Sequence, residues 1–305
     1  MPPTSPNIYI RQNDPWALQL LAAQRRLYSD AKTIHNARMV LIALGTIASV
    51  ILVPLFPQTR ITIGIISGTL LFLISILGGA QEKRKAKEAA SVQEELDTKL
   101  FQIPYNEMLT DQPTATLISE AARRYKGEPL RNWYSNTKNI PRPLDILLCQ
   151  RSNLGWGSSL HRKWQAVLIG EIVVLTTLIV ILALIWSLSF AELLASMIVP
   201  ALPLIKELTE QAHTHGDNAR SKAAAEQKVM TLWKASLTRR KNLQEQDCRS
   251  IQDRILIARQ TNASIPDWFN KINHGTHEAV MIESTEALIS QAVEAGIDRD
   301  EPQGE

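Results

Sequence analysis

The chain contains 305 residues, of which 45% are hydrophobic and 21% are charged, and its formal net charge is +3. A net charge this small does not indicate nucleic-acid binding, so we expect no nucleic-acid partner. The two cysteines, Cys149 and Cys248, are too few and too far apart for a disulfide framework or a cysteine-rich metal site. Averaged over the chain, the composition is typical of a soluble protein of about two domains.

The hydrophobic residues, however, are concentrated in residues 39–79 and 164–205. These two regions contain one basic residue, whereas the other 222 residues contain 32 of the 33 lysines and arginines. This distribution predicts a mainly α membrane protein with two transmembrane helical hairpins, and therefore four transmembrane helices. The remaining residues predict long cytosolic helical extensions and a small loop-containing cytosolic lobe.

Residues 1–38 predict a cytosolic N-terminal helix. Asp14 is suited to the N-cap position and Pro15 to the first helical position. Apolar residues then recur at steps of three and four and define one face of a helix: Trp16, Leu20, Ala23, Leu27, Ala31 and Ile34. No helix-breaking residue follows before Met39, so we expect this helix to continue into the membrane.

Residues 39–79 predict the first transmembrane hairpin. Residues 39–56 and 61–79 contain no charged side chain and approach the length of about 20 residues that a spanning helix needs. The sequence Pro-Gln-Thr-Arg at residues 57–60 predicts a tight turn between them. Both helices contain small residues, such as Gly45 in the first and Gly64 and Gly68 in the second. Small residues allow helices to approach closely, either within one chain or between copies of it.

Residues 80–163 predict the cytosolic helical lobe. Residues 81–100 are rich in Ala, Glu and Lys, which favour helix, and we expect them to extend the second membrane helix and to pair with the N-terminal helix. Residues 104–163 contain five prolines and predict loops around one helix over residues 114–126, ended by Gly127. Residues 149–154 are expected in a loop.

Residues 164–205 predict the second transmembrane hairpin, with its turn at residues 187–189. Ser189 and Glu192 have the spacing of a capping box. Pro200 and Pro203 are expected to kink or end the fourth helix. Glu171 lies within the apolar run, where a carboxylate is a candidate functional group. We expect Glu171 either to line a pore or to pair with Lys163 or Lys206. We favour the capping role for Glu192 and keep a membrane or pore role as the alternative.

Residues 206–305 predict a cytosolic C-terminal helical region with an acidic tail. We expect a nearly unbroken helix from residue 206 to about residue 260, a break at residues 264–269 and a final helix over about 276–295. The acidic tail after Asp298 is expected to be disordered.

The distribution of basic residues predicts the orientation of the helices. Within 20 residues of the membrane ends, the three long segments contain 15 lysines and arginines, whereas the two short turns contain Arg60 only. Because basic residues are retained on the cytosolic side, we expect all three long segments and both termini in the cytosol. No signal peptide is expected, since the first apolar run begins at Met39.

The motifs of common enzyme classes are absent from the sequence, so we predict no catalytic residues, no metal site and no cofactor. His213 and His215 are two residues apart and fall on different faces of a helix. Arginines and amides in the cytosolic segments are the remaining candidates for binding, because guanidinium groups match phosphate oxygens and aromatic rings stack on bases. For Arg151 we favour the alternative that it pairs with an acid and braces the lobe on the membrane. Arg249, Arg254 and Arg259 recur at fives and spiral around their helix.

Several segments together resemble the SMODS-associated four-transmembrane effector family. The first set is residues 11–13, 20–28 and 31–32. The second is residues 147–154 with Arg162 and Lys163. The third is residues 250–255 with Arg259, residues 266–269, Glu278 and Met281. The resemblance implies a bacterial inner-membrane effector of antiphage CBASS systems that is activated by a cyclic-oligonucleotide second messenger. It also implies a homo-oligomer that forms pores in the lipid bilayer and thereby causes abortive infection. On this resemblance the candidate ligand-binding residues are Arg151, Asn153, Arg254, Arg259 and Trp268.

Two other functions remain open on the sequence alone. A constitutive ion channel or transporter would place Glu171 on the ion path. A non-conducting membrane scaffold would bind partner proteins and leave permeability unchanged. No inverted repeat relates the two hairpins, which disfavours a transporter.

Overall fold

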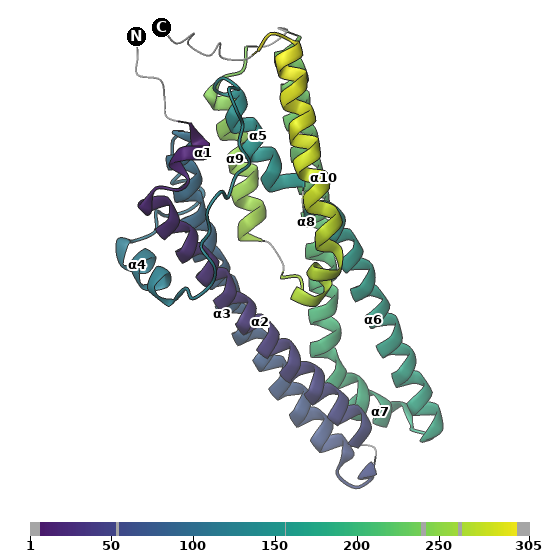
Figure 1. Ribbon diagram of the computed structural model, residues 1–305. Helices are drawn as coiled ribbons and strands as arrows, with labels where there is room; N and C mark the ends of the chain where they lie inside the picture. The colour runs from purple at the N-terminus through teal and green to yellow at the C-terminus, as the bar shows by residue number, and fades with distance from the viewer. Residues whose placement is uncertain (1–6, 53–54, 156, 239–241, 262–263, 298–305) are drawn as a thin grey trace, which may run out of the picture. The chain divides into compact units, whose positions relative to one another are not determined.

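The computed structural model describes residues 7–52, 55–155, 157–238, 242–261 and 264–297, and all regular structure in these ranges is helical. The expected acidic tail lies outside the described residues, as do the side chains of Glu278 and Met281. In chain order the helices are α1 (Ile8–Arg11), α2 (Pro15–Leu52), α3 (Arg60–Phe101), α4 (Ala115–Arg124), α5 (Leu144–Gly155), α6 (Gly157–Ile185), α7 (Phe190–Leu193), the π-helix η2 (Leu194–Ile198), α8 (Val199–Leu237), α9 (Glu245–Gln260) and α10 (Asp267–Glu294) (Figure 1).

The chain divides into two compact units, and each is described separately. Unit 1 comprises residues 1–28, 86–160 and 218–305, and unit 2 comprises residues 29–85 and 161–217. The divisions fall within helices α2, α3, α6 and α8, so each of these helices supplies residues to both units.

Unit 1 has a hydrophobic core to which α1, α2, α3, α4, α5, α8, α9 and α10 contribute. The fully buried side chains include Leu21 and Leu27 of α2, Leu96 and Leu100 of α3, Ile146 and Leu147 of α5, Trp233 of α8, Ile251 of α9 and Ala292 of α10. Residues of α2 and of the C-terminal part of α3 thus contribute to the same hydrophobic core.

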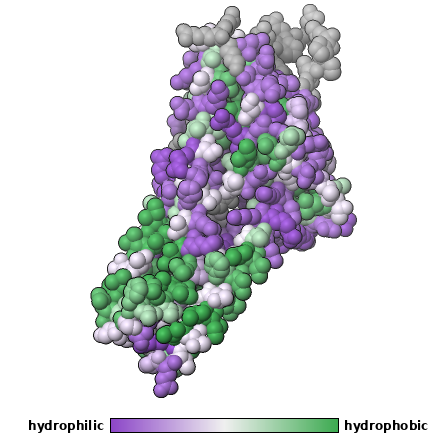
Figure 2. All heavy atoms as spheres, turned by 180° about the vertical axis from the view of Figure 1, so that it is seen from behind, coloured by the Kyte–Doolittle hydropathy of each residue, from purple (hydrophilic) through white to green (hydrophobic). Residues whose placement is uncertain are grey.

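Unit 2 carries the apolar surface. The described residues contain three helices long and apolar enough to cross a membrane, within Pro15–Leu52, Arg60–Phe101 and Leu144–Ile185. Large aliphatic side chains such as Leu44, Ile66 and Val174 are exposed along them, and Figure 2 shows hydrophobic side chains gathered over the helices of this unit. Because a soluble protein rarely leaves so continuous an apolar surface in water, these helices are candidate membrane spans.

The fourth expected span, residues 190–205, is not among the three. It is divided into α7, η2 and the first residues of α8, and the charged pair Lys206 and Glu207 follows directly. Pro200 does not end the helix, since α8 continues through Pro203 to Leu237. Instead, the irregularity is absorbed by the π-helix that precedes Pro200, and the buried Thr46 hydroxyl donates to the Pro200 carbonyl at 3.2 Å.

Four expectations about the helix boundaries were wrong. Residues 149–154 lie in α5 and not in a loop, because α5 buries Leu147, Leu148 and Leu154 in the core. The helix from residue 206 ends at Leu237, and α9 begins anew with a capping box between Gln244 and Asp247. Helix α10 begins at Asp267, behind Pro266 at its N-cap, and not near residue 276. Helix α4 ends at Arg124 because Tyr125 is extended, before Gly127 is reached.

Candidate functional site

Unit 1 buries two carboxylates on α3. Glu94 and Asp97 are one helical turn apart, and both are 0% exposed. Removing a carboxylate from water is costly unless cations or hydrogen-bond donors compensate for the lost hydration. The residues that surround these two acids therefore define the polar interior of the unit.

Helix α9 supplies most of the compensating groups. Arg249 Nη2 donates to Glu94 Oε1 at 2.7 Å, and Arg259 Nη1 donates to Asp97 Oδ2 at 2.7 Å. Between them, Gln252 Nε2 donates to Glu94 Oε2 at 2.8 Å and to Asp97 Oδ2 at 3.0 Å. Positions 249, 252 and 259 share one face of an α-helix, so a single helix can present all three groups to α3.

A second set of hydrogen bonds extends from Asp97. Tyr134 Oη donates to Asp97 Oδ1 at 2.6 Å and accepts from Asn153 Nδ2 at 2.9 Å. The pKa of Tyr134 lies well above its usual value, because the ring is buried and Asp97 is negatively charged. Gln150 Nε2 of α5 donates to Gln252 Oε1 at 3.2 Å. We call Glu94, Asp97, Tyr134, Gln150, Asn153, Arg249, Gln252 and Arg259 the buried network.

Positive charge accumulates at one end of the buried network. Burial and the nearby Arg259 cation lower the pKa of Lys222, on α8, to about 8. Arg259 is partly buried, with 11% of its side chain exposed, and Asp97 and neighbouring tyrosines hold its pKa above the usual value. Its Nη2 atom is buried without a hydrogen-bond partner among the described residues. Two cations close together in a region with little water favour an anion as a third partner.

The structure brings two of the five nominated ligand residues, Asn153 and Arg259, into the buried network. Arg151 lies apart from it, where Nη1 donates to Ser284 Oγ at 3.1 Å and Nε lies 3.6 Å from Glu226 Oε1. Arg254 is exposed on another face of α9. Trp268 is 57% exposed at the start of α10 and packs edge-on against Phe269.

Sequence reasoning missed Glu94, Asp97, Tyr134, Gln150, Gln252 and Lys222. One signal was available: Glu94 and Asp97 occupy the same helical face as the apolar Ala90 and Leu100, which are buried. Charged residues on an apolar helical face are a sign of buried ion pairs. Tyr134 lies in an irregular segment, where periodicity gives no information.

Unit 2 contains a separate ionic cluster, which we call the Arg38 cluster. Arg38 Nη2 donates to Glu82 Oε2 at 2.7 Å, and its Nη1 forms an ion pair with Glu207. His35 Nδ1 lies 3.0 Å from the other Glu82 oxygen, and Lys206 Nζ lies 3.5 Å from Glu207 Oε1. The cluster links α2, α3 and α8 directly beside the apolar stretches of those helices.

The two nominated membrane carboxylates have different surroundings. Glu192 completes the predicted capping box, since its Oε2 accepts from the Ser189 amide at 2.9 Å, and it also forms an ion pair with Arg60. These contacts join the two predicted turns of unit 2. Glu171 forms no hydrogen bond or ion pair with the described residues and lines an open cavity together with apolar side chains.

The small residues of α3 have a packing role within the chain. A Cβ atom at Gly64 would lie 2.1 Å from the Ala195 carbonyl oxygen, and one at Gly68 would lie 2.8 Å from Val199. Helix α3 therefore approaches η2 and the start of α8 as closely as backbone atoms allow.

The two neighbouring histidines diverge, as their spacing indicates. His213 Nε2 lies 3.2 Å from Asp217, whereas the buried His215 Nδ1 lies 2.7 Å from His161 Nδ1. Within the described ranges, no group of three or more His, Cys, Asp and Glu side chains is arranged to hold a metal ion.

These features define a class: a helical membrane protein with candidate spans in one unit and a buried ionic network in the other. The chain belongs to the SMODS-associating 4TM effector family, whose domain matches residues 6–288. It is also similar to a protein of Bacillus cereus (strain VD146) described as a probable CBASS effector molecule, with 24% identity over 291 residues, covering 90% of this chain and 95% of that protein. No solved structure matches the chain. Family membership confirms the resemblance and points to antiphage defence at a membrane.

Proposed function

We propose that this protein is a bacterial inner-membrane effector that binds a cyclic-oligonucleotide second messenger in unit 1 and then permeabilises the membrane through unit 2. Both termini would lie in the cytosol, and the active form would be a homo-oligomer. The outcome for an infected cell would be death or arrest before phage release. Family membership and the name of the Bacillus cereus relative support the defence role.

The observation that supports the sensing step is the presence of two partly buried cations, Arg259 and Lys222, with Arg259 Nη2 left without a hydrogen-bond partner among the described residues. Burial and the nearby Arg259 cation lower the pKa of Lys222, so its charged form is less favourable there than in water. A phosphate bound between the two cations would restore the lost electrostatic stabilisation, because it would accept hydrogen bonds from both. A cyclic oligonucleotide carries such phosphates together with bases.

The energetic requirement for switching is modest. To change a 1:99 equilibrium to 99:1, a ligand must bind the active state more favourably by about 5.5 kcal/mol. Charge-assisted hydrogen bonds contribute about 1.5–3 kcal/mol each, so two cations and a few further contacts suffice. The ligand would compete with Asp97 for Arg259 and thereby loosen the hydrogen bonds that join α3 to α9.

The membrane step would require the helices of unit 2 to separate. The Arg38 cluster joins α2, α3 and α8, and the Arg60–Glu192 pair and the close approach at Gly64 join α3 to α7 and η2. Breaking these contacts would expose polar groups within the apolar unit, and association of several copies would shield those groups around a conducting path.

The sensing step is tested by measuring the thermal stability of the detergent-purified protein against a panel of cyclic di- and trinucleotides. We expect one of them to raise the melting temperature in a saturable manner. Lys222→Met is expected to abolish this shift, whereas Lys228→Met is expected to preserve it, because Lys228 is exposed on the same helix. A shift that is equal in both variants would place the ligand elsewhere, and no shift with any nucleotide would contradict the proposal.

A constitutive channel is a second candidate, favoured by the Glu171 carboxylate, which has no ion-pair partner in the part of the chain that the structure describes. It predicts ion flux through reconstituted protein without any nucleotide, and strong loss of that flux in Glu171→Gln. A protein that stays impermeable with and without nucleotide, and that captures partner proteins, would indicate the scaffold function instead.

A further inference from the structure

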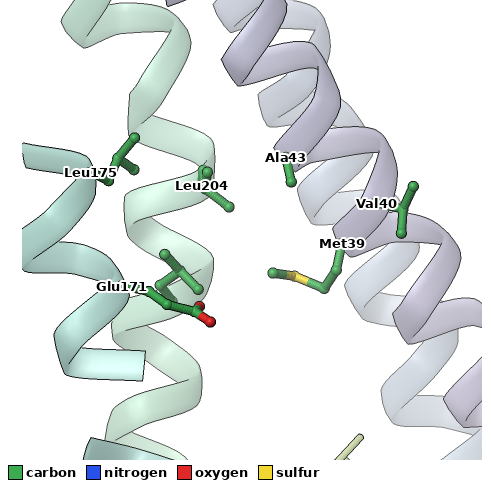
Figure 3. Close-up of a pocket in the computed structure, with 7 residues that line it drawn as sticks. Met39, Val40, Ala43, Glu171, Leu175 and Leu204 are labelled. Atoms are coloured by element: carbon green, nitrogen blue, oxygen red, sulfur yellow. The ribbon is translucent and has the colours of Figure 1, made fainter. Parts of the chain in front are cut away.

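Unit 2 contains an open cavity of about 320 Å³ along the apolar parts of three helices, and the Glu171 side chain that lines it is exposed. Its lining includes Met39 and Ala43 of α2, Glu171 and Leu175 of α6, and Leu204 and Leu208 of α8. Figure 3 shows the Glu171 carboxylate directed from α6 into this space, toward the side chain of Met39 on α2. The volume is at the lower end of the range for small-molecule sites, which is about 300–1,000 Å³.

Glu171 differs from the acids around it. Glu82 and Glu207 pair with Arg38, and Glu192 pairs with Arg60. Glu171 has no such partner among the described residues, and the other side chains that line the cavity are apolar. A carboxylate within an apolar span is costly unless an opposite charge or a polar group compensates for it.

The shape and chemistry of the cavity select among ligands. An alkyl chain alone would fill the space and leave the carboxylate without compensation. An anionic amphiphile would be repelled by it. An amphiphile with a single ammonium group would satisfy both requirements, since its head pairs with Glu171 while its chain contacts Leu175, Leu204 and Leu208.

We propose that this cavity is an intramembrane binding site for a lipophilic ammonium, a straight-chain amine whose cationic head pairs with Glu171. The site is independent of the nucleotide site in unit 1, because it uses none of the residues of the buried network. Occupancy would hold α2, α6 and α8 of unit 2 in the arrangement described here, since all three helices contact the ligand.

The test compares decylamine, decanol and decanoate, which share a chain and differ in the head group. Each is titrated below its micellar concentration against the full-length protein in a non-ionic detergent, and the melting temperature is recorded. We expect decylamine to bind at least about tenfold more tightly than decanol, because a hydrogen bond to a charged group is worth that factor or more. Decanoate is expected to bind least tightly.

Two variants and a labelling measurement locate the site. Glu171→Gln is expected to reduce decylamine binding to the level of decanol, whereas Glu210→Gln, at an exposed carboxylate of the same unit, is expected to leave it unchanged. If either variant fails to fold, a photoreactive decylamine on the unaltered protein still decides: labelled peptides should contain residues 39–43, 171–175 or 204–208. Labelling spread evenly over the apolar surface, or equal binding of amine and alcohol, would overturn the proposal.

Discussion

Arg259 on α9 and Asp97 on α3 form an ion pair in the interior of unit 1, with Nη1 and Oδ2 2.7 Å apart. Asp97 also accepts from Tyr134 and Gln252, so one carboxylate joins α3, α9 and the irregular segment before α5. Because Asp97 is fully buried and accepts from three donors, we expect substitutions of it to destabilise the fold. The consequences for stability, for pH dependence and for ligand binding are distinct and can be measured separately.

Replacing Asp97 by alanine should strongly destabilise the protein. The change leaves the Arg259 guanidinium buried beside Lys222 with its carboxylate partner removed, and breaking a buried ion pair costs about 3–5 kcal/mol. Thermal unfolding in detergent measures the effect. Asp253→Ala is the matched control, since its carboxylate, 2.7 Å from Arg249, is more exposed, and we expect a smaller loss. Equal losses in the two variants would show that Asp97 has no special role.

Lys222→Met should stabilise the free protein at neutral pH by about 1–3 kcal/mol while removing the response to nucleotide. The pKa of Lys222 is about 8 in the folded state, below the usual value of 10.5. Between these values the unfolded chain binds more protons, so the contribution of Lys222 to stability rises as the pH rises from about 8 to 10.5.

The stability of the unaltered protein minus that of Lys222→Met isolates this contribution. Other groups titrate in the same range: burial raises the pKa of Cys248 to about 12, so its thiol stabilises the fold less as the pH rises past its usual value. That loss is common to both proteins and cancels in the difference. A difference that stays flat from pH 7 to 10 would contradict the assigned environment of Lys222.

Arg38→Met should destabilise unit 2, because Glu82 and Glu207 would both lose the cation between them. We expect a loss of about 3–5 kcal/mol, as for other buried pairs that lose one partner. Adding Glu207→Gln should restore part of the stability by removing one of the two uncompensated carboxylates. Melting temperatures of the single and double variants measure the coupling, and strictly additive losses would argue against a shared cluster.

Gly64→Ala should destabilise the packing of α3 against η2 by about 1–3 kcal/mol, since the added methyl would meet the Ala195 carbonyl. Gly170→Ala is the matched control: a Cβ atom there meets no atom within 4 Å. Alanine favours helix more than glycine, so we expect Gly170→Ala to be neutral or slightly stabilising. Comparable losses at both positions would mean that Gly64 is not at a close helix contact.

The sequence predicted the helices whose signal is local. The start of α2 at Pro15 follows from Asp14 and the proline, and its length follows from the lack of any breaker before Leu52. The capping box of Ser189 and Glu192 was likewise predicted and is confirmed, because it depends on residues three apart.

The sequence did not predict features that depend on partners distant along the chain. The sequence does not distinguish Arg249, Arg254 and Arg259 from one another. In the structure, α3 contacts the face of α9 that carries Arg249 and Arg259, and Arg254 is exposed. Tertiary packing decides which arginine pairs with Glu94 or Asp97, because the two partners of each pair are more than 150 residues apart in the chain. The π-helix before Pro200 is similar, since the two prolines indicate a distortion without specifying its form.

Dye release from liposomes that contain the reconstituted protein is the measurement that tests the central claim most directly. The cyclic oligonucleotide that stabilises the purified protein is added to dye-loaded vesicles. We predict saturable release from vesicles with the unaltered protein and with Lys228→Met, and none with Lys222→Met. Vesicles that retain the dye although the nucleotide binds, or that release it equally without nucleotide, would contradict a ligand-activated membrane effector.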